Sequence, residues 1–340
     1  MAVRIAVDAM GGDHAPGVIV RGAVQALADR DDVELVLIGD EGRVHAELRP
    51  LDLDDQAARV RVVHASQIIE MDESPVEGLR AKKDSSIVVM AKIAANREVD
   101  AVISAGNTGA CAAACQLKMR PLPNVTRAGI AVTIPSFHGP FVLCDVGANI
   151  QTKARHLYEY GVMSTAYAQK VLGIERPRVA LLSIGEEDKK GTDLVKQTHE
   201  LLTDDPDIDF VGNVEGKDLF SNVCDVALCD GFVGNILLKL TEGLADGLFQ
   251  TIFHEVAEEE PAVRDKIQAA VKRIYTRHDY TEYGGAPLLG IDGVCIICHG
   301  RSNERAIRNA VRVAGQFVSM GLNEAIVERL GRAAPVRAGT

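Results

Sequence analysis

The sequence predicts an α/β fold of three layers, in which helices cover both faces of a mostly parallel β-sheet. Short apolar and β-branched runs alternate with helical patterns along most of the 340 residues, as in strands joined by crossover helices. Several runs end in glycine, asparagine, serine or aspartate, as do the ligand-binding loops of parallel sheets. No linker separates independent units. We therefore expect one large α/β domain over residues 1–332, with a helix-pair excursion at about 237–275 and a frayed tail at 333–340.

The predicted strands are short and rich in valine, isoleucine and leucine, as strands covered on both faces are. Ile130–Ile134 and Phe141–Cys144 are separated by a proline-bounded turn, so these two are expected to pair antiparallel. The others, in chain order, are Val3–Val7, Val33–Ile38, Arg59–Val63, Ala101–Ile103, Val179–Leu182, Phe210–Val211, Val226–Cys229 and Val294–Cys298.

Helical patterns fill the segments between these strands. A helix capped by Asp84 or Ser85 is expected to run through Ile93, and a long one spans roughly Lys153–Leu172. Helices also follow the loops ending at Gly109, Thr192, Asn235 and Ser302, and the pattern from Leu237 to Tyr275 contains two helices broken near Pro261. Residues Tyr283–Pro287, with two glycines and a proline, are expected to form a loop.

Composition excludes several classes of function. The net charge of −11 gives no general attraction to a phosphate backbone, and 4% aromatic residues without tryptophan argue against base stacking, so we expect no nucleic-acid partner. No apolar stretch is long enough to span a membrane, and Arg4 and Asp8 interrupt the first short run, which is unlike a signal peptide. Seven cysteines, an odd number, suggest reduced thiols in the cytoplasm.

The cysteines are expected to pack in the core. Cys111 and Cys115 lie four residues apart on one face of a small-residue helix, and Cys295 and Cys298 lie in a buried strand. No second cysteine pair stands at zinc-site spacing, so we expect no metal.

The loop after the first strand is the first candidate for ligand binding. Asp8 ends the strand, Gly11 and Gly12 allow a sharp turn or close approach, and Asp13 and His14 add polar groups beside that opening. An ordinary turn between strand and helix would have the same pattern, so the choice depends on how often it recurs.

The pattern recurs in four further loops, each expected to precede a helix. Because a helix N-terminus offers free backbone N–H groups and a positive dipole, several converging would form an anion pocket. Four such loops predict a phosphate-sized or polyanionic ligand. They are Ser104–Gly109, Asp145–Asn149, Asp230–Asn235 and His299–Ser302.

Nucleotide and covalent-nucleophile motifs are missing from these positions. No Gly-x-Gly-x-x-Gly follows the first strand, and the Gly185–Thr192 loop lacks the ending of a phosphate-binding P-loop. The chain has no Gly-x-Ser-x-Gly elbow. The same loop carries Lys190, a cation that could neutralise an oxyanion or phosphate, although most charge runs are solvated surface.

Five motifs together, in this order, resemble the phosphate acyltransferase family of bacterial phospholipid synthesis (the PlsX family). The resemblance runs from about Val3 to about Val327. It implies transfer of a long-chain acyl group from acyl carrier protein to inorganic phosphate, a homodimer without cofactor, and a fold similar to phosphotransacetylases and isocitrate/isopropylmalate dehydrogenases. The motifs are Asp8–Pro16, Ser104–Gly109, Asp145–Asn149, Asp230–Asn235 and Tyr283–Gly290.

The resemblance favours Lys190 and Asn235 as the catalytic pair, facing the thioester oxygen or the departing sulfur. Since a thioester is already activated, bound phosphate can attack it directly, and positioning supplies the rate. Phosphate would be held by Ser104, Gly106, Asn107, Thr108 and Gly109. Further substrate contacts are expected from Asp8, Gly11, Gly12, Asp13, His14, Asp145, Asn149, Asp230, His299, Gly300 and Ser302.

Docking of an acidic carrier protein on a chain of this charge requires a local basic patch. One candidate lies on the second helix of the 237–275 pair, with Arg264, Lys266, Lys272 and Arg273, and another holds Arg80, Lys82 and Lys83; either could equally be a solvated face. Apolar residues of the helix pair would serve dimer or core contacts, or reversible contact with a membrane, where a glycerol-phosphate acyltransferase would take the product.

Two alternatives of other classes remain. One is a related enzyme, either a phosphotransacetylase using coenzyme A or a metal-dependent hydroxy-acid dehydrogenase. The other is a non-catalytic regulator that binds acyl carrier protein without consuming acyl chains.

Overall fold

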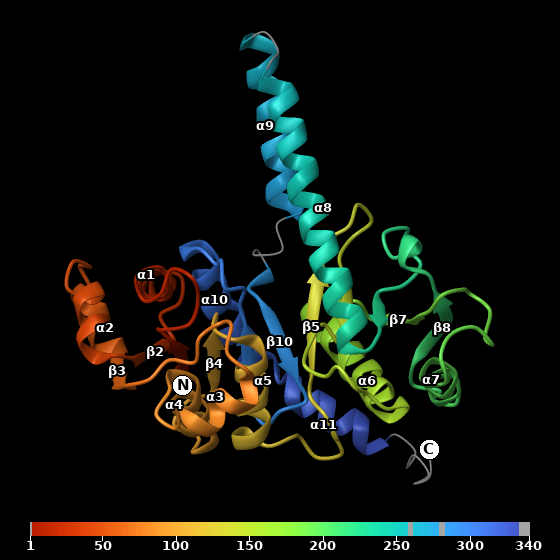
Figure 1. Cartoon of the computed structure of the whole chain (residues 1–340), viewed down its shortest axis with the longest axis horizontal. Helices are drawn as coiled ribbons and strands as arrows, with labels where there is room; N and C mark the ends of the chain where they lie inside the picture. Colours follow the sequence, from red (N-terminus) through yellow and green to blue (C-terminus); the bar gives the residue numbers. More distant parts are fainter. Residues whose placement is uncertain (1, 258–260, 279–282, 333–340) are drawn as a thin grey trace.

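The computed structural model of the chain describes residues 2–257, 261–278 and 283–332. In these residues eleven strands form one sheet, in the order β3-β2-β1-β4-β11-β10-β5-β6-β9-β7-β8. Figure 1 shows the sheet running across the molecule from β3 on one side to β8 on the other. The strands are β1 Val3–Asp8, β2 Val33–Gly39, β3 Val60–His64, β4 Ala101–Ser104, β5 Gly129–Ile134, β6 Phe141–Cys144, β7 Arg178–Leu182, β8 Asp209–Val214, β9 Val226–Leu228, β10 Ala286–Leu289 and β11 Val294–Ile297.

Helices cover both faces of this sheet, which confirms the predicted three-layer class. Alternate side chains of a strand enter different cores: Ile5 and Val7 of β1 pack on one face, and Ala6 packs on the other. The helices are α1 Gly17–Gln25, α2 Glu41–Leu48, α3 Pro75–Ala81, α4 Ser86–Ala95, α5 Thr108–Met119, α6 Ala154–Val171, α7 Asp193–Thr203, α8 Gly231–Ala257, α9 Pro261–His278, α10 Glu304–Met320 and α11 Leu322–Arg332.

The sheet consists of two parallel halves that run in opposite directions. β1, β2, β3, β4 and β11 are mutually parallel, as are β6, β7, β8 and β9. Between them β10 pairs antiparallel with both β11 and β5, and β5 pairs antiparallel with β6, as predicted for the last two strands. Because three successive pairings are antiparallel, the strands of one half run opposite to those of the other.

The register of β10 brings the carboxyl ends of the two halves together. Its first residues, Ala286 and Pro287, pair with β11, whereas Leu288 and Leu289 pair with β5. The last residue of β11 therefore lies level with Ala286. Asp145, which directly follows β6, accepts the N–H of Ile130 with its side chain, and Ile130 is the partner of Leu288, so β6 ends nearly level with Leu288. Loops leaving strands of both halves meet near the middle of the sheet.

The sequence interpretation of Tyr283–Pro287 as a loop was wrong in part, since β10 begins at Ala286. Gly284 and Gly285 do adopt positive φ angles, as a loop would. Pro287 pairs with Ile296 of β11, and the pairing with β5 begins at the next residue, Leu288.

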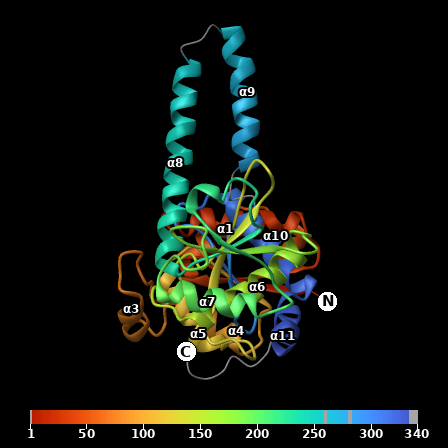
Figure 2. The ribbon, with the colours of Figure 1, turned by 90° about the vertical axis from the view of Figure 1, so that its right-hand side faces the viewer.

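α8 and α9 lie side by side and project from the body of the molecule as a long arm (Figures 1 and 2). They begin and end near the boundaries predicted for the helix pair, with the break before Pro261. None of the helices in the described ranges combines the length and apolar character that crossing a bilayer requires. The predicted tail, 333–340, lies outside the described residues.

The first turn of α8 is pressed against the loop that leaves β6. A Cβ atom at Gly234 would overlap the carbonyl oxygen of Asp145 and lie 2.9 Å from the sulfur of Cys229. At Gly243, on the same helix, a Cβ would meet nothing within 4 Å. The first glycine is therefore required by packing, and the second is not.

We expect Gly234→Ala to lower the free energy of unfolding by about 1–3 kcal/mol, because the added methyl group forces α8 away from β6. Gly243→Ala, the matched control, should raise it by up to about 1 kcal/mol, since alanine favours an exposed helix interior. Chemical denaturation of both variants measures the difference. Equal effects of the two substitutions would contradict the close contact at Gly234.

Candidate active site

A cavity of about 300 Å³ lies where the loops of the two halves meet. All four of the loops predicted to converge contribute to its wall, together with β5, β10 and the first turns of α8. The lining residues from the loops are Thr108 and Gly109, Val146 and Gly147, Gly231, Phe232 and Asn235, and His299. The predicted convergence of separate strand ends is therefore confirmed.

Two helix N-termini face this cavity, and they differ in how they are capped. Asp230 caps α8, where its Oδ1 accepts the N–H groups of Phe232 and Val233 at 2.9 and 3.0 Å. Asn107 caps α5 with a neutral amide oxygen, which accepts the N–H of Ala110 at 3.0 Å. Because a carboxylate already neutralises the α8 end, the α5 end keeps more of its positive potential. An anion is therefore better placed at Thr108 and Gly109.

Asn107 also fixes the approach to α3. Its Nδ2 donates to the backbone carbonyls of Glu70, Met71 and Glu73 over 2.9–3.3 Å. Both ends of this side chain are therefore occupied by backbone groups, and it is 6% exposed. Asn107 shapes the loop, and direct contact with phosphate through its side chain stays a prediction.

Asp8 and Ser104 lie below the cavity and are not in its wall. The hydroxyl of Ser104 donates to Asp8 Oδ2 at 2.7 Å and accepts the N–H of Gly106 at 3.1 Å. Burial raises the pKa of Asp8, and its hydrogen bonds to hydroxyl groups oppose that rise. A Cβ at Gly11 would lie 2.6 Å from the backbone nitrogen of Gly106, so the first loop packs directly against the second. These residues support the Ser104–Gly109 loop.

Asp145 has a comparable supporting role in the other half. Its carboxylate accepts the N–H groups of Ile130, Gly147, Ala148 and Asn149 at 2.8–3.2 Å. Burial raises its pKa, whereas these backbone bonds lower it. The amide of Asn149 in turn donates to the Ala128 carbonyl and the Tyr160 hydroxyl. From this motif Val146 and Gly147 line the cavity, whereas Asp145 and Asn149 do not.

His299 lies at the cavity with a cation beside it. The Nζ atom of Lys239 is 3.1 Å from His299 Nε2, and the N–H of Arg301 donates to Nδ1 at 3.1 Å. Burial lowers the pKa of His299, and the charge of Lys239 lowers it further, so the ring is neutral near pH 7.

The remaining residues predicted from this region connect loops to one another. The N–H of Asp13 donates to the carbonyl of Gly300 at 2.9 Å, which joins the first loop to the His299 loop. Asp13 and His14 are exposed, whereas Ser302 is buried with its N–H on the His299 carbonyl. Gly12 lies between these loops with φ of 107°.

Sequence reasoning missed Lys239 as a cavity residue. It follows Asn235 by four positions on α8, so both lie on the same helix face, and both line the cavity. The four-residue spacing from Asn235 is the sequence feature that could have identified Lys239 as a cavity residue. Lys239 also forms an ion pair with Glu242 at 3.4 Å, and Glu242 lines the cavity too.

Lys190 occupies a different position from Asn235. Its loop leaves β7, the neighbour of β9 in the sheet, so both loops start from the same edge. The side chain of Lys190 is exposed and is not among the residues that line the cavity. The catalytic pairing of Lys190 with Asn235 stays a prediction.

The predicted docking residues lie on α9, in the projecting arm. Lys266, Lys272 and Arg273 are exposed, and Arg264 is 3.6 Å from Asp265. They are therefore separate from the cavity wall, and their contact with a carrier protein stays a prediction.

Residues 3–325 match the sequence model of the family described as "Fatty acid synthesis protein". A phosphate acyltransferase of Nitratidesulfovibrio vulgaris (strain DP4) is 45% identical over 328 residues, which cover 96% of this chain and 94% of that protein. A phosphate acyltransferase of Desulfitobacterium hafniense (strain DSM 10664 / DCB-2) is 44% identical over 333 residues, which cover 97% and 98%.

Solved structures with a similar fold include a phosphotransacetylase from Streptococcus pyogenes, with a TM-score of 0.64, 17% identity and 94% of each chain covered. A branched-chain phosphotransacylase from Enterococcus faecalis V583 has a TM-score of 0.59 and 15% identity, covering 93% of this chain and 99% of that one. At these identities the likeness concerns the fold. The sequence matches are far stronger, and on them the chain belongs to the fatty acid synthesis protein family, in which the two relatives above are named phosphate acyltransferases.

Proposed function

We propose that this chain transfers a long-chain acyl group from acyl carrier protein to inorganic phosphate and releases an acyl phosphate. Membership of the family makes it an acyltransferase. The observation that carries the finer proposal is one cavity that joins the neutrally capped N-terminus of α5 to apolar walls. An anion and an acyl chain can therefore occupy it side by side.

Phosphate is best placed at the start of α5. Thr108 and Gly109 form the first turn of α5 and line the cavity, and the free backbone N–H groups and dipole of a helix N-terminus favour an anion. Lys239 supplies a cation in the same wall, held by Glu242 and next to neutral His299. Asn235, one turn before Lys239, presents an amide that can donate to the carbonyl oxygen of a bound thioester.

The acyl chain has an apolar continuation along α8. A second cavity of about 390 Å³ shares Val132, Leu238 and Glu242 with the first. It runs between the β5–β6 hairpin and the helices of the arm, and its wall is mostly aliphatic and aromatic. An acetyl group would leave this space empty, so it favours a long chain over a phosphotransacetylase substrate. Its other apolar lining residues are Ile134, Pro135, Phe137, Phe220, Ala245, Leu248, Phe249 and Ile274.

The reaction proceeds by direct attack. A phosphate oxygen forms a bond to the thioester carbon, the carbonyl oxygen gains negative charge, and the carbon–sulfur bond then breaks to release the carrier thiol. An acyl-enzyme would require a thiolate or activated hydroxyl. Cys298 lines the cavity, but burial raises the pKa of its thiol to about 12, which disfavours a nucleophilic thiolate.

Carrier-protein docking on α9, a homodimer and peripheral membrane contact complete the proposal. The exposed basic residues Lys266, Lys272 and Arg273 suit an acidic partner. Leu240, Leu244 and Leu248 are exposed along α8 and would be covered by a second copy or by lipid. The proposed location is cytoplasmic, and the product is passed to a membrane glycerol-phosphate acyltransferase.

Mass spectrometry of palmitoyl-acyl carrier protein mixed with phosphate and this protein tests the function. We expect free carrier protein and palmitoyl phosphate in equal amounts, with the protein itself unmodified. Binding without loss of the acyl group would show a regulator, and preference for palmitoyl-coenzyme A would show a phosphotransacetylase-like enzyme. An acyl group trapped on the protein when phosphate is omitted would refute direct attack, and NAD reduction would show a dehydrogenase.

Lys190→Ala is expected to lower kcat by about 100-fold or more, because it removes a cation from the developing negative charge. Lys189→Ala, the exposed neighbour in the same loop, is the matched control and should retain turnover. Steady-state kinetics with circular dichroism on both variants separates catalysis from folding. Near-normal turnover of Lys190→Ala would end its catalytic assignment and leave Lys239 as the cation of the site.

Ala245→Phe should shorten the accepted acyl chain, because it fills the second cavity. We expect kcat/KM for palmitoyl carrier protein to fall about tenfold or more relative to octanoyl carrier protein, since each buried methylene contributes about 0.8 kcal/mol. Leu244→Phe, one residue earlier and outside the lining set, should leave the ratio unchanged. An equal loss for both substrates would place the chain elsewhere.

A further inference from the structure

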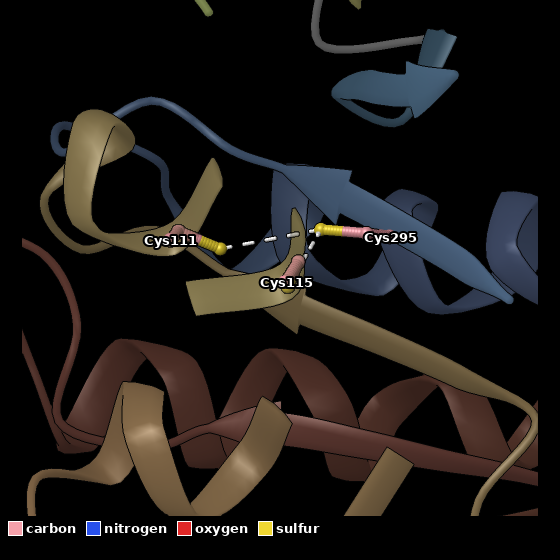
Figure 3. Close-up of side chains that lie close together, drawn as sticks. All are labelled: Cys111, Cys115 and Cys295. Atoms are coloured by element: carbon pink, nitrogen blue, oxygen red, sulfur yellow. Dashed lines mark hydrogen bonds between the residues drawn. The ribbon is translucent and has the colours of Figure 1, made fainter. Parts of the chain in front are cut away.

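Three buried thiols converge beneath the active site. Cys111 and Cys115 lie one turn apart on α5, and Cys295 reaches them from β11 (Figure 3). The Cys295 sulfur is 4.0 Å from that of Cys111 and 3.7 Å from that of Cys115, and all three lie within 4.8 Å of one another. Their exposure is 0%, 0% and 1%. All three are free thiols.

The spacing matches a three-sulfur coordination site. With metal–sulfur bonds of about 2.3 Å, sulfurs around a planar three-coordinate ion are about 4.0 Å apart, and those around a tetrahedral ion about 3.8 Å apart. Two thiols packed in a core can touch at similar distances. Here, however, sulfurs from two elements close a triangle, and among the residues that the structure describes no other group of three potential ligands does so.

The surroundings restrict the kind of ion. The three thiols belong to an apolar core cluster that also includes Ile297, and the two oxygen-bearing groups near Cys111, Ser104 and Asp8, are hydrogen-bonded to each other, so oxygen-preferring ions lack a full set of free oxygen ligands. Soft thiolates select Cu(I), Zn(II) or related ions, and Cu(I) accepts three sulfurs without the fourth ligand that Zn(II) prefers. Cys111 is in the first turns of α5, where the helix dipole favours a thiolate.

We propose that Cys111, Cys115 and Cys295 form a binding site for Cu(I). On binding, the coordinated thiols release their protons to solvent, and no oxidation or reduction takes place. Because the sulfurs are buried, the ion enters during local opening of this part of the structure. The site is independent of the proposed acyl transfer, although it connects both walls of the cavity: α5 begins at Thr108, and β11 leads to His299.

Titration of the full-length protein with Cu(I), under anaerobic conditions and against a chromogenic chelator, tests the proposal. We expect one Cu(I) per chain to be withdrawn from the chelator. Cys115→Ala and Cys295→Ala should lose this binding. The matched control is Cys224→Ala, which removes a buried thiol outside the group, and it should keep the binding. Retention in the first two variants, or loss in the control, would overturn the assignment.

X-ray absorption of the Cu(I)-loaded wild-type protein gives a second measurement that does not depend on the folding of a variant. We expect three sulfur neighbours at one distance of about 2.3 Å. Two sulfurs, or a mixture with nitrogen or oxygen, would overturn the three-thiol site. Circular dichroism of each variant, measured without metal, separates lost ligands from lost structure.

Discussion

The pairing of β10 is the constraint on which the active site depends. This strand has four residues, and it pairs with β11 through its first half and with β5 through its second. The offset sets how far the two opposed halves of the sheet slide past each other. A shift of one residue would also turn Leu288 and Leu289 to the wrong faces of a sheet that is covered on both sides. The register of β10 therefore determines whether the loops of the two halves meet at one cavity.

Around this junction, most of the buried polar side chains form hydrogen bonds to backbone groups of the loops. Asp145 satisfies four N–H groups, Ser104 joins Asp8 to the loop after β4, and both ends of Asn107 bond main-chain atoms. Each such hydrogen bond adds only modestly to the free energy of unfolding, but breaking one leaves a buried polar group without a partner, which destabilises the fold more strongly. The loops around the cavity are therefore held by bonds to buried polar side chains, which suits the direct attack proposed above.

Much of this arrangement could be predicted from the sequence, because strand and helix patterns and strand-end glycines are local signals. Thr108, Asn235 and His299 were identified that way, and they do share a cavity. β10 was missed because Gly284, Gly285 and Pro287 give a loop signal that tertiary pairing overrides. The sequence also could not tell which aspartates are buried, since Asp8, Asp145 and Asp230 look alike in sequence. Only the packing separates the buried Asp8 and Asp145 from Asp230, the half-buried cap of α8.

α8 connects the cavity to the projecting arm. It has 27 residues, about 40 Å at ~1.5 Å per residue, and carries Asn235 and Lys239 near one end and Leu248 farther along the arm. Gly231 and Gly234 hold the base of α8 in close contact with the loop after β6, so one continuous helix connects the cavity wall to the projecting arm. A contact made along the arm is therefore made on the same helix that places Asn235 and Lys239 at the cavity.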